Sequence, residues 1–286
     1  MTERRVGTTD IHPFTRIVAL IIIPFLLVAS VILVVLPTRT EALFAWTIAP
    51  PFTAMLLGAA YVGGIVYFVG VLRLRWWHEV KYGIPAVFVF ATLLGIATLL
   101  HWDKFHAGHL SFIVWATLYA TTPVLIVIVW IVNSAAATRS ATDGAQDRHD
   151  VRIPLLARAL FAGLGLASLV AGAVLFVSPE LIVGKWAWDV TPLTARVVGA
   201  ILTLPGVVNV WMLVDARWSS FRGMLRAELV SLGFILLALV VAGRDLHGDR
   251  VAAPAFVAMI VVAAVGYVAL YVYCERRLRA EIVSSS

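Results

Sequence analysis

The chain has 286 residues, of which 62% are hydrophobic and 13% charged, and its formal net charge is +6 at pH 7. Soluble domains usually carry about a quarter charged residues, so this composition excludes an ordinary soluble domain. The single cysteine, Cys274, excludes an internal disulfide and a cysteine-ligated metal cluster.

The apolar residues are gathered in long blocks that are separated by short polar connections. A helix needs about 20 residues to cross the hydrocarbon of a bilayer, so these blocks predict membrane-spanning helices and an all-α polytopic membrane protein. The first block is too long for the apolar region of a signal peptide, and we expect it to be retained as a span. The eight predicted spans are residues 17–36, 52–72, 83–100, 110–132, 154–177, 194–214, 227–242 and 251–274.

Positive charge is distributed unevenly over the loops. When the loops are assigned alternately to the two sides, 16 of the 22 Lys and Arg residues fall on the side of the N-terminus. Cytoplasmic loops are enriched in Lys and Arg, so both termini are expected in the cytoplasm, with the protein in the plasma (inner) membrane. This distribution explains the net charge without a nucleic-acid partner; the expected partner is the lipid bilayer. The other side holds Arg39, Lys104, Lys185, Arg196, Arg244 and Arg250.

Tryptophans gather near the ends of the predicted spans. Trp and Tyr are enriched at both membrane–water interfaces, so we interpret these residues as interfacial belts with no binding role. They are Trp76, Trp77 and Trp218 at the cytoplasmic edge, and Trp46, Trp102, Trp186 and Trp188 at the outer edge.

Several residues recur at one constant offset of 142 residues along the chain, in register with the predicted spans. We therefore predict a tandem duplication of a four-helix unit, with residues 1–133 as the first repeat, 134–153 as a cytoplasmic linker and 154–286 as the second repeat. Because four is an even number, the repeats are expected to be parallel and related by an axis along the membrane normal. The matched landmarks are Pro37 with Pro179, Arg75-Trp76 with Arg217-Trp218, and Asp103 with Asp245.

The segment from Trp186 to Arg196 reads W-x-W-x-x-T-P-L-T-A-R. Within it, Thr191 followed by Pro192 predicts the N-cap and first residue of a helix. The segment resembles a motif of uncharacterised multi-pass bacterial membrane proteins. The resemblance implies a bacterial membrane protein and assigns no activity or site residue.

The stretch HWDKFHAGH lies between the third and fourth spans. On a helix, His106 and His109 would share one face with Asp103 one turn back, and neutral imidazole suits zinc, copper, nickel or iron. One interpretation is therefore an outer-face metal or redox site formed by His101, Asp103, His106 and His109. The other is a hairpin loop in which the aspartate caps the next helix, and Lys104 inside the cluster favours this second interpretation.

No cofactor is expected, because a bis-histidine haem needs histidines inside facing spans and no histidine lies inside a predicted span. Charged residues inside the spans are nearly absent as well. Glu228 is placed in the first turn of the seventh span, where it is expected to pair with Arg222 or Arg226, and Arg196 is expected to lie at the outer edge. This placement disfavours a proton-driven pump with a carboxylate at mid-membrane.

Residues that break helices occur at corresponding places in two spans. Gly63 and Gly64 lie in the middle of the second span, and Pro205 and Gly206 in the middle of the sixth, with Asn209 one turn further. Matched interruptions in two repeats are the best sequence indicator of a transporter's binding site, so these five residues form a candidate solute site. The alternative is close helix packing through small residues.

Motifs of catalysis are missing from the sequence: it has no H-E-x-x-H, no Gly-rich phosphate loop and no G-x-S-x-G, so we expect no enzyme. The preferred hypothesis is a transporter-like protein with a site for a small hydrophobic or weakly polar solute between the second helices of the two repeats. The alternatives are a non-catalytic scaffold, sensor or partner subunit that binds other membrane proteins, and the metal or redox module.

Overall fold

The computed structural model describes residues 9–140 and 150–285. Within these ranges the protein is all-α and forms no β-strand. Eight of its helices are long and apolar enough to cross a membrane, as the sequence predicts. They are α1 (Pro13–Val35), α3 (Pro51–Arg73), α4 (Gly83–Leu100), α5 (Leu110–Ser140), α6 (Leu155–Val177), α7 (Pro192–Trp211), α8 (Trp218–Ala242) and α9 (Ala252–Ser285); α2 (Thr40–Leu43) is a short turn of helix between α1 and α3.

Most helix bounds agree with the predicted spans, and three differ. α5 and α9 extend beyond the predicted spans to Ser140 and Ser285, and α8 begins at Trp218, nine residues before the predicted span. The beginning of the predicted linker therefore continues α5, and its residues 141–149 lie outside the described part of the chain. At α7 the predicted start is confirmed, because Thr191 is the N-cap and accepts a hydrogen bond from the backbone N–H of Thr194.

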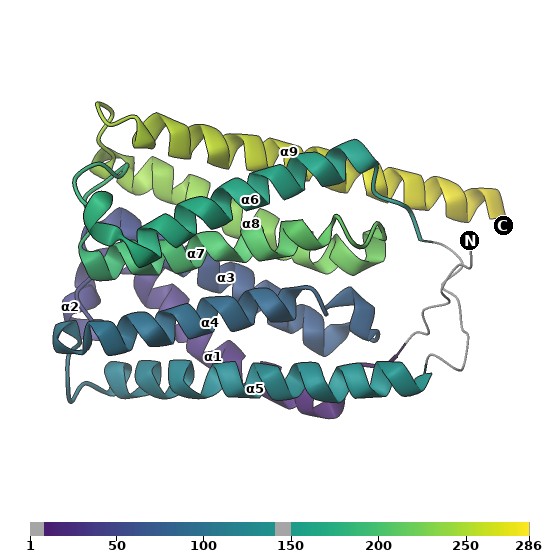
Figure 1. Cartoon of the computed structure of the whole chain (residues 1–286), viewed down its shortest axis with the longest axis horizontal. Helices are drawn as coiled ribbons and strands as arrows, with labels where there is room; N and C mark the ends of the chain where they lie inside the picture. The colour runs from purple at the N-terminus through teal and green to yellow at the C-terminus, as the bar shows by residue number, and fades with distance from the viewer. Residues whose placement is uncertain (1–8, 141–149, 286) are drawn as a thin grey trace.

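The long helices run roughly side by side along one axis (Figure 1). α1 packs along α3 and α6 along α7, while α3 packs on α8 and α7 on α4. α5 flanks α4, and α9 flanks α8. In the most apolar windows of α3 and α7, 61% and 72% of the residues are buried, against at most 44% in the other six helices. α3 and α7 therefore lie at the centre of the bundle.

The outer helices expose large apolar side chains. Leu160 on α6, Val240 on α8 and Val262 on α9 are 65%, 85% and 61% exposed. Such a surface is stable in lipid, where the backbone groups are satisfied inside the helices. The protein is therefore a multi-pass membrane protein surrounded by a lipid bilayer.

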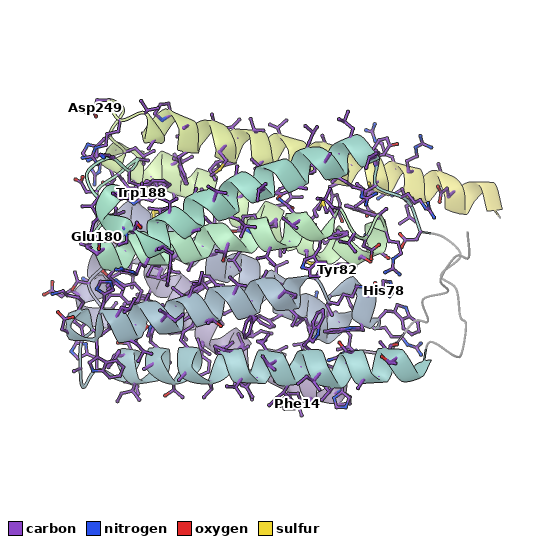
Figure 2. All side chains as sticks on the ribbon, in the orientation of Figure 1. Phe14, His78, Tyr82, Glu180, Trp188 and Asp249 are labelled. Carbon is purple, nitrogen blue, oxygen red and sulfur yellow. The ribbon has the colours of Figure 1, made fainter. Side chains whose placement is uncertain are left out.

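The first helix begins and the last helix ends at the same end of the bundle, called here the termini end (Figure 1). The opposite end, called the hairpin end, holds the connection between α1 and α3 and the connection between α6 and α7. Figure 2 shows Trp188 and Glu180 near the hairpin end, and Tyr82 and His78 near the termini end.

Tryptophans of the hairpin end are mostly structural. Trp46 and Trp188 are 2% and 0% exposed, so the interpretation of these two as interfacial belt residues is wrong, and Trp218 at the termini end is buried too. Trp102, by contrast, is 52% exposed. Trp46 packs against Trp115 with ring centroids 4.7 Å apart, and Trp188 packs against Phe256 at 5.1 Å. These aromatic pairs join the loop before each central helix to α5 and α9, because edge-to-face ring contacts are favourable in a buried setting.

Two arginines tie neighbouring helices together at the termini end. The guanidinium of Arg16 on α1 donates to the carbonyls of Leu72 and Leu74 at the end of α3. The guanidinium of Arg158, at the equivalent position of α6, donates to the carbonyls of Met212 and Leu213 at the end of α7. Carbonyls at a helix C-terminus lack intrahelical donors, so each arginine satisfies them and fixes its helix pair.

Candidate functional site

A cavity of about 180 Å³ lies inside the bundle between α3, α4, α7 and α8. Its lining on α7 extends from Ile201 to Asn209, and its lining on α8 from Met224 to Ile235. The α8 range is in the middle of its helix, and the α7 range is in the C-terminal half of its helix, so the cavity lies within the bundle and is shifted toward the termini end. Side chains from the four outer helices complete the walls.

Four of the five residues of the predicted solute site border this cavity, namely Gly63, Gly64, Pro205 and Asn209. Gly206 does not; a Cβ added there would lie 2.9 Å from the carbonyl oxygen of Gly165, so its role is the close packing of α7 on α6. Gly63 also permits close packing, because a Cβ at this position would lie 3.1 Å from the carbonyl oxygen of Ala227 on α8. Gly206 therefore serves helix packing, whereas Gly63 both packs closely on α8 and borders the cavity.

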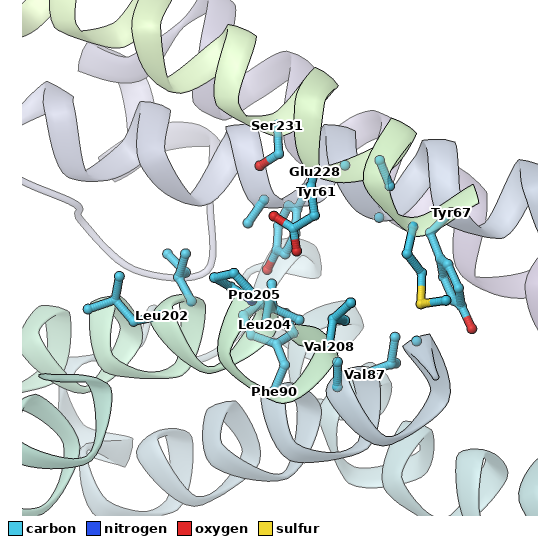
Figure 3. Close-up of a pocket in the computed structure, with 18 of the residues that line it drawn as sticks. Tyr61, Tyr67, Val87, Phe90, Leu202, Leu204, Pro205, Val208, Glu228 and Ser231 are labelled. Carbon is cyan, nitrogen blue, oxygen red and sulfur yellow. The ribbon is translucent and has the colours of Figure 1, made fainter. Parts of the chain in front are cut away.

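Glu228 on α8 lines the cavity, whereas the sequence predicted it in the first turn of the seventh span. Since α8 begins at Trp218, Glu228 is ten residues inside the helix, which corresponds to about 15 Å from its start. Figure 3 shows its side chain projecting from α8 into the cavity. The two arginines expected to pair with it are engaged elsewhere: Arg222 with Glu275 at 2.6 Å and Arg226 with the Tyr271 hydroxyl at 2.6 Å.

The carboxyl group of Glu228 has no hydrogen bond or ion pair with any described residue. An unpaired carboxylate in a low-dielectric setting is costly, and ionisable residues inside a membrane mark functional sites by default. The sequence predicted no carboxylate at mid-membrane. This prediction is wrong, because α8 begins at Trp218 and Glu228 lies well inside the helix.

Hydrogen bonds link other polar side chains at the cavity wall. The hydroxyls of Tyr61 on α3 and Tyr119 on α5 are 2.7 Å apart. The Asn209 amide on α7 donates to the Tyr267 hydroxyl on α9 at 2.5 Å, while Asn209 Oδ1 is buried and lacks a donor within the described residues. A buried acceptor without a donor is costly, so Asn209 adds a second unpaired acceptor to the residues that line the cavity.

The rest of the wall is apolar and rich in aromatic rings. Among the described residues that line the cavity, Glu228 is the single member of the Asp, Glu, Lys, Arg and His group. The wall can therefore hold a small apolar body and one polar or charged group, but not a strongly hydrated ion. The aromatic residues of the wall are Tyr61, Tyr67, Phe68, Phe90, Tyr119, Phe256 and Tyr267.

The histidine loop does not assemble into a ligand set. Across the described residues no group of three or more His, Cys, Asp or Glu is placed to hold a metal ion. His101 Nε2 lies 2.6 Å from Arg196 Nη1, and burial together with this guanidinium lowers the pKa of His101. Asp103 pairs with Lys104 at 2.8 Å. A cationic neighbour on each side disfavours binding of a metal cation.

His106 and His109 also lie in a turn, because α5 begins only at Leu110. Their rings are 5.1 Å apart, and His106 contacts the Thr47 hydroxyl and the Phe44 carbonyl at 3.1 Å each. These contacts tie the loop to the α2–α3 connection, which is a structural role for His106.

The aspartate of the α8–α9 connection caps a helix, though not the next one. Asp245 accepts a hydrogen bond from the backbone N–H of Phe52, at the start of α3, at 3.0 Å. The N-cap residue of α3 is Pro50, whose side chain makes no capping bond, so Asp245 supplies this from the other half of the chain.

A buried polar cluster lies at the termini end beyond the cavity. Asp215 accepts hydrogen bonds from Tyr82 and Ser220 at 3.0 Å each and from Arg217 at 2.7 Å. Burial by itself raises the pKa of Asp215, but the hydrogen bonds and charge of Arg217 outweigh it and hold the pKa below its usual value. Tyr82 precedes Gly83, which lines the cavity, so this cluster closes the bundle on that side.

Comparison with known proteins gave no match among family models, among curated proteins or among solved structures.

Proposed function

We propose that this protein is a carrier that binds a small, weakly polar solute in the central cavity and moves it across the membrane. The observation that carries the proposal is the cavity itself. Its volume of about 180 Å³ is comparable with apolar cavities of about 150 Å³ that hold benzene. It lies beside Gly63 on α3 and Pro205 on α7, although both helices continue through these residues and the predicted interruptions are absent. No catalytic step is part of the proposal.

The proposed architecture is a parallel duplication, with repeats at residues 1–133 and 154–286 and the cavity on the axis between them. α1 (Pro13–Val35) and α6 (Leu155–Val177) have the same length, and the constant offset between the repeats relates both their first and their last residues. The pairs α1 with α3 and α6 with α7 pack alike, as do α3 with α8 and α7 with α4. These equivalences support a pseudo-two-fold axis along the membrane normal.

The proposed orientation places the termini end in the cytoplasm of a bacterial cell, with the protein in the inner membrane. Support comes from the 16 of 22 Lys and Arg residues that the loop assignment gives to this side, since cytoplasmic loops are enriched in them.

Access to the cavity from both sides tests the carrier proposal without knowledge of the solute. In a Cys274→Ala background, Ser231→Cys places a thiol in the cavity wall. A membrane-impermeant methanethiosulfonate reagent is then applied to right-side-out and to inside-out vesicles. We expect modification from both sides, because a carrier opens alternately to each.

Two matched valine variants complete the experiment. Val208→Phe fills the cavity and should suppress the modification of the Ser231→Cys variant, whereas Val240→Phe, at a lipid-facing position that is 85% exposed, should leave it unchanged. Modification from one side only, or from neither, overturns the carrier proposal.

A further inference from the structure

We propose that the solute of the cavity is a small lipophilic amine whose ammonium group binds to Glu228. This inference rests on the proposed function, because it assigns the chemical class of the carried solute.

Glu228 has no counter-charge among the described residues of the cavity wall. A carboxyl group in a low-dielectric cavity needs either its own proton or a nearby cation. Among the described residues of the wall there is no Lys, Arg or His, and the nearest arginines along α8 are bound to Glu275 and Tyr271. A cation that pairs with Glu228 must therefore enter from outside the protein.

The type of unsatisfied hydrogen-bonding atom also favours an ammonium group. Glu228 projects into the cavity without a donor, and Asn209 Oδ1 is a buried acceptor of another lining residue that also lacks a donor in the described part of the chain. An ammonium group carries three donors and no acceptor, which is the complement of such a pair. An anion or a carbonyl-bearing solute would add acceptors to a wall that already has an excess of them.

The cavity wall suits an organic cation and does not suit a metal ion. Magnesium and calcium require about six or more oxygen ligands, whereas Ser231 is the one polar neighbour of Glu228 among the wall residues of α8. Apart from Thr122, Ser168 and Asn209, the remaining wall is hydrocarbon and aromatic, which suits the apolar body of an amine. Aromatic faces such as Phe90 and Tyr267 also attract ammonium groups through cation–π interactions.

Other titratable groups around Glu228 are phenols alone. They are Tyr61 and Tyr67 on α3, Tyr119 on α5 and Tyr267 on α9, and the described wall residues of α1, α4, α6 and α7 include none. A phenol carries no positive charge, so these residues leave the negative charge of an ionised Glu228 for the ligand to neutralise.

A pair of probes of equal shape tests the assignment. 4-Fluorobenzylamine carries an ammonium at pH 7, and 4-fluorobenzyl alcohol is its uncharged counterpart. Binding of each to the purified full chain is measured by fluorine NMR, with the Val208→Phe variant as the blank for detergent partitioning. We expect the amine to bind at least about tenfold more tightly than the alcohol, as for one charge-assisted hydrogen-bonded pair.

The charge variant is Glu228→Gln, which keeps the shape of the side chain and removes a charge from the membrane interior. It should abolish the preference for the amine and leave the affinity for the alcohol unchanged. Glu228→Asp, which retains the carboxylate one methylene shorter, should retain a reduced preference. Glu41→Gln, at an exposed position of the hairpin end, is the matched control and should behave like the wild-type chain.

The outcomes separate the two proposals. Equal affinities for amine and alcohol, or a preference that survives Glu228→Gln, overturn the amine assignment and leave the cavity as a site for an uncharged solute. Absence of binding by both probes, together with a cavity thiol modified from neither side, overturns the carrier proposal as well.

Discussion

At the hairpin end, the two halves of the chain are built alike, whereas around the cavity they differ. Trp46 and Trp188, at equivalent positions of the two halves, are both buried against an aromatic ring of the last helix in their own half. The backbone N–H of His106 donates to Ala45, and that of His247 donates to Ala187, at 2.9 and 2.8 Å. These contacts hold equivalent loops in equivalent places.

Around the cavity, the constant offset between the halves relates unlike side chains. Ala86 on α4 corresponds to Glu228 on α8, and Tyr67 on α3 corresponds to Asn209 on α7; all four line the cavity. The loops at the hairpin end are held by equivalent contacts, while the cavity keeps unpaired acceptors in the second half. The loops of the hairpin end are therefore common to both halves, whereas the unpaired acceptors of the cavity belong to the second half alone.

The largest difference that we expect concerns two ion pairs at the termini end, which are formed by the equivalent arginines Arg75 and Arg217 with aspartates at non-equivalent positions. Arg217 binds Asp215, whose side chain is 9% exposed, whereas Arg75 binds Asp10, whose side chain is 64% exposed. Breaking a buried pair leaves an uncompensated charge, so Asp215→Asn should lower the free energy of unfolding by about 3 kcal/mol. Asp10→Asn should lower it by about 0.5 kcal/mol or less, because solvent screens an exposed pair. Denaturant titration in mixed micelles measures both.

The pH dependence follows from the lowered pKa of Asp215. A carboxyl group whose pKa is lower in the folded chain stabilises that chain fully above its unfolded pKa of about 4, and this stability is lost as the pH falls toward the folded pKa. The difference in stability between wild-type protein and Asp215→Asn should therefore be constant near neutral pH and shrink below about pH 4. A difference that does not depend on pH would contradict the role of this charge.

Most of the fold was predictable, because hydrocarbon imposes long apolar helices whose length and composition are visible in the sequence. The start of α8 was not. Arg222 and Arg226 interrupt the apolar block, so the hydropathy pattern places the span at residue 227 although the helix begins at Trp218. The signal that was available is helical spacing: Trp218, Phe221 and Leu225 form a buried stripe that continues through Glu228.

The candidate site was predictable in part. Predicted helix breaks in corresponding spans drew attention to Gly63 and Pro205, which do border the cavity. Sequence spacing does not tell which neighbour a glycine meets, and Gly206 packs against α6 instead. The histidine loop had the composition of a metal site, but its geometry depends on Arg196 and on the α2–α3 connection, which come from distant parts of the chain.

Moving the carboxylate from α8 to the equivalent position of α4 tests whether both halves of the chain face the cavity alike. In the double variant Glu228→Gln with Ala86→Glu, the cavity regains one carboxylate at the equivalent position of α4. If the two halves face the cavity alike, the double variant should recover a preference for 4-fluorobenzylamine of about tenfold over Glu228→Gln alone. The fluorine NMR titration measures it. Failure to recover the preference would contradict the equivalence of the two positions toward the cavity.

The smallest expected effect concerns the two buried tryptophans of the hairpin end, Trp46 and Trp188. Trp188 Nε1 donates to the Thr53 hydroxyl at 2.8 Å, whereas Trp46 Nε1 has no acceptor among the described residues. Replacement by phenylalanine removes a similar volume at both sites, but only Trp188→Phe also breaks a hydrogen bond and leaves the buried Thr53 without it. Trp188→Phe should therefore cost about 1 kcal/mol more unfolding free energy than Trp46→Phe. Equal losses in micelle denaturation would mean that ring packing alone holds both tryptophans, and that the bond between Trp188 and α3 adds no stability.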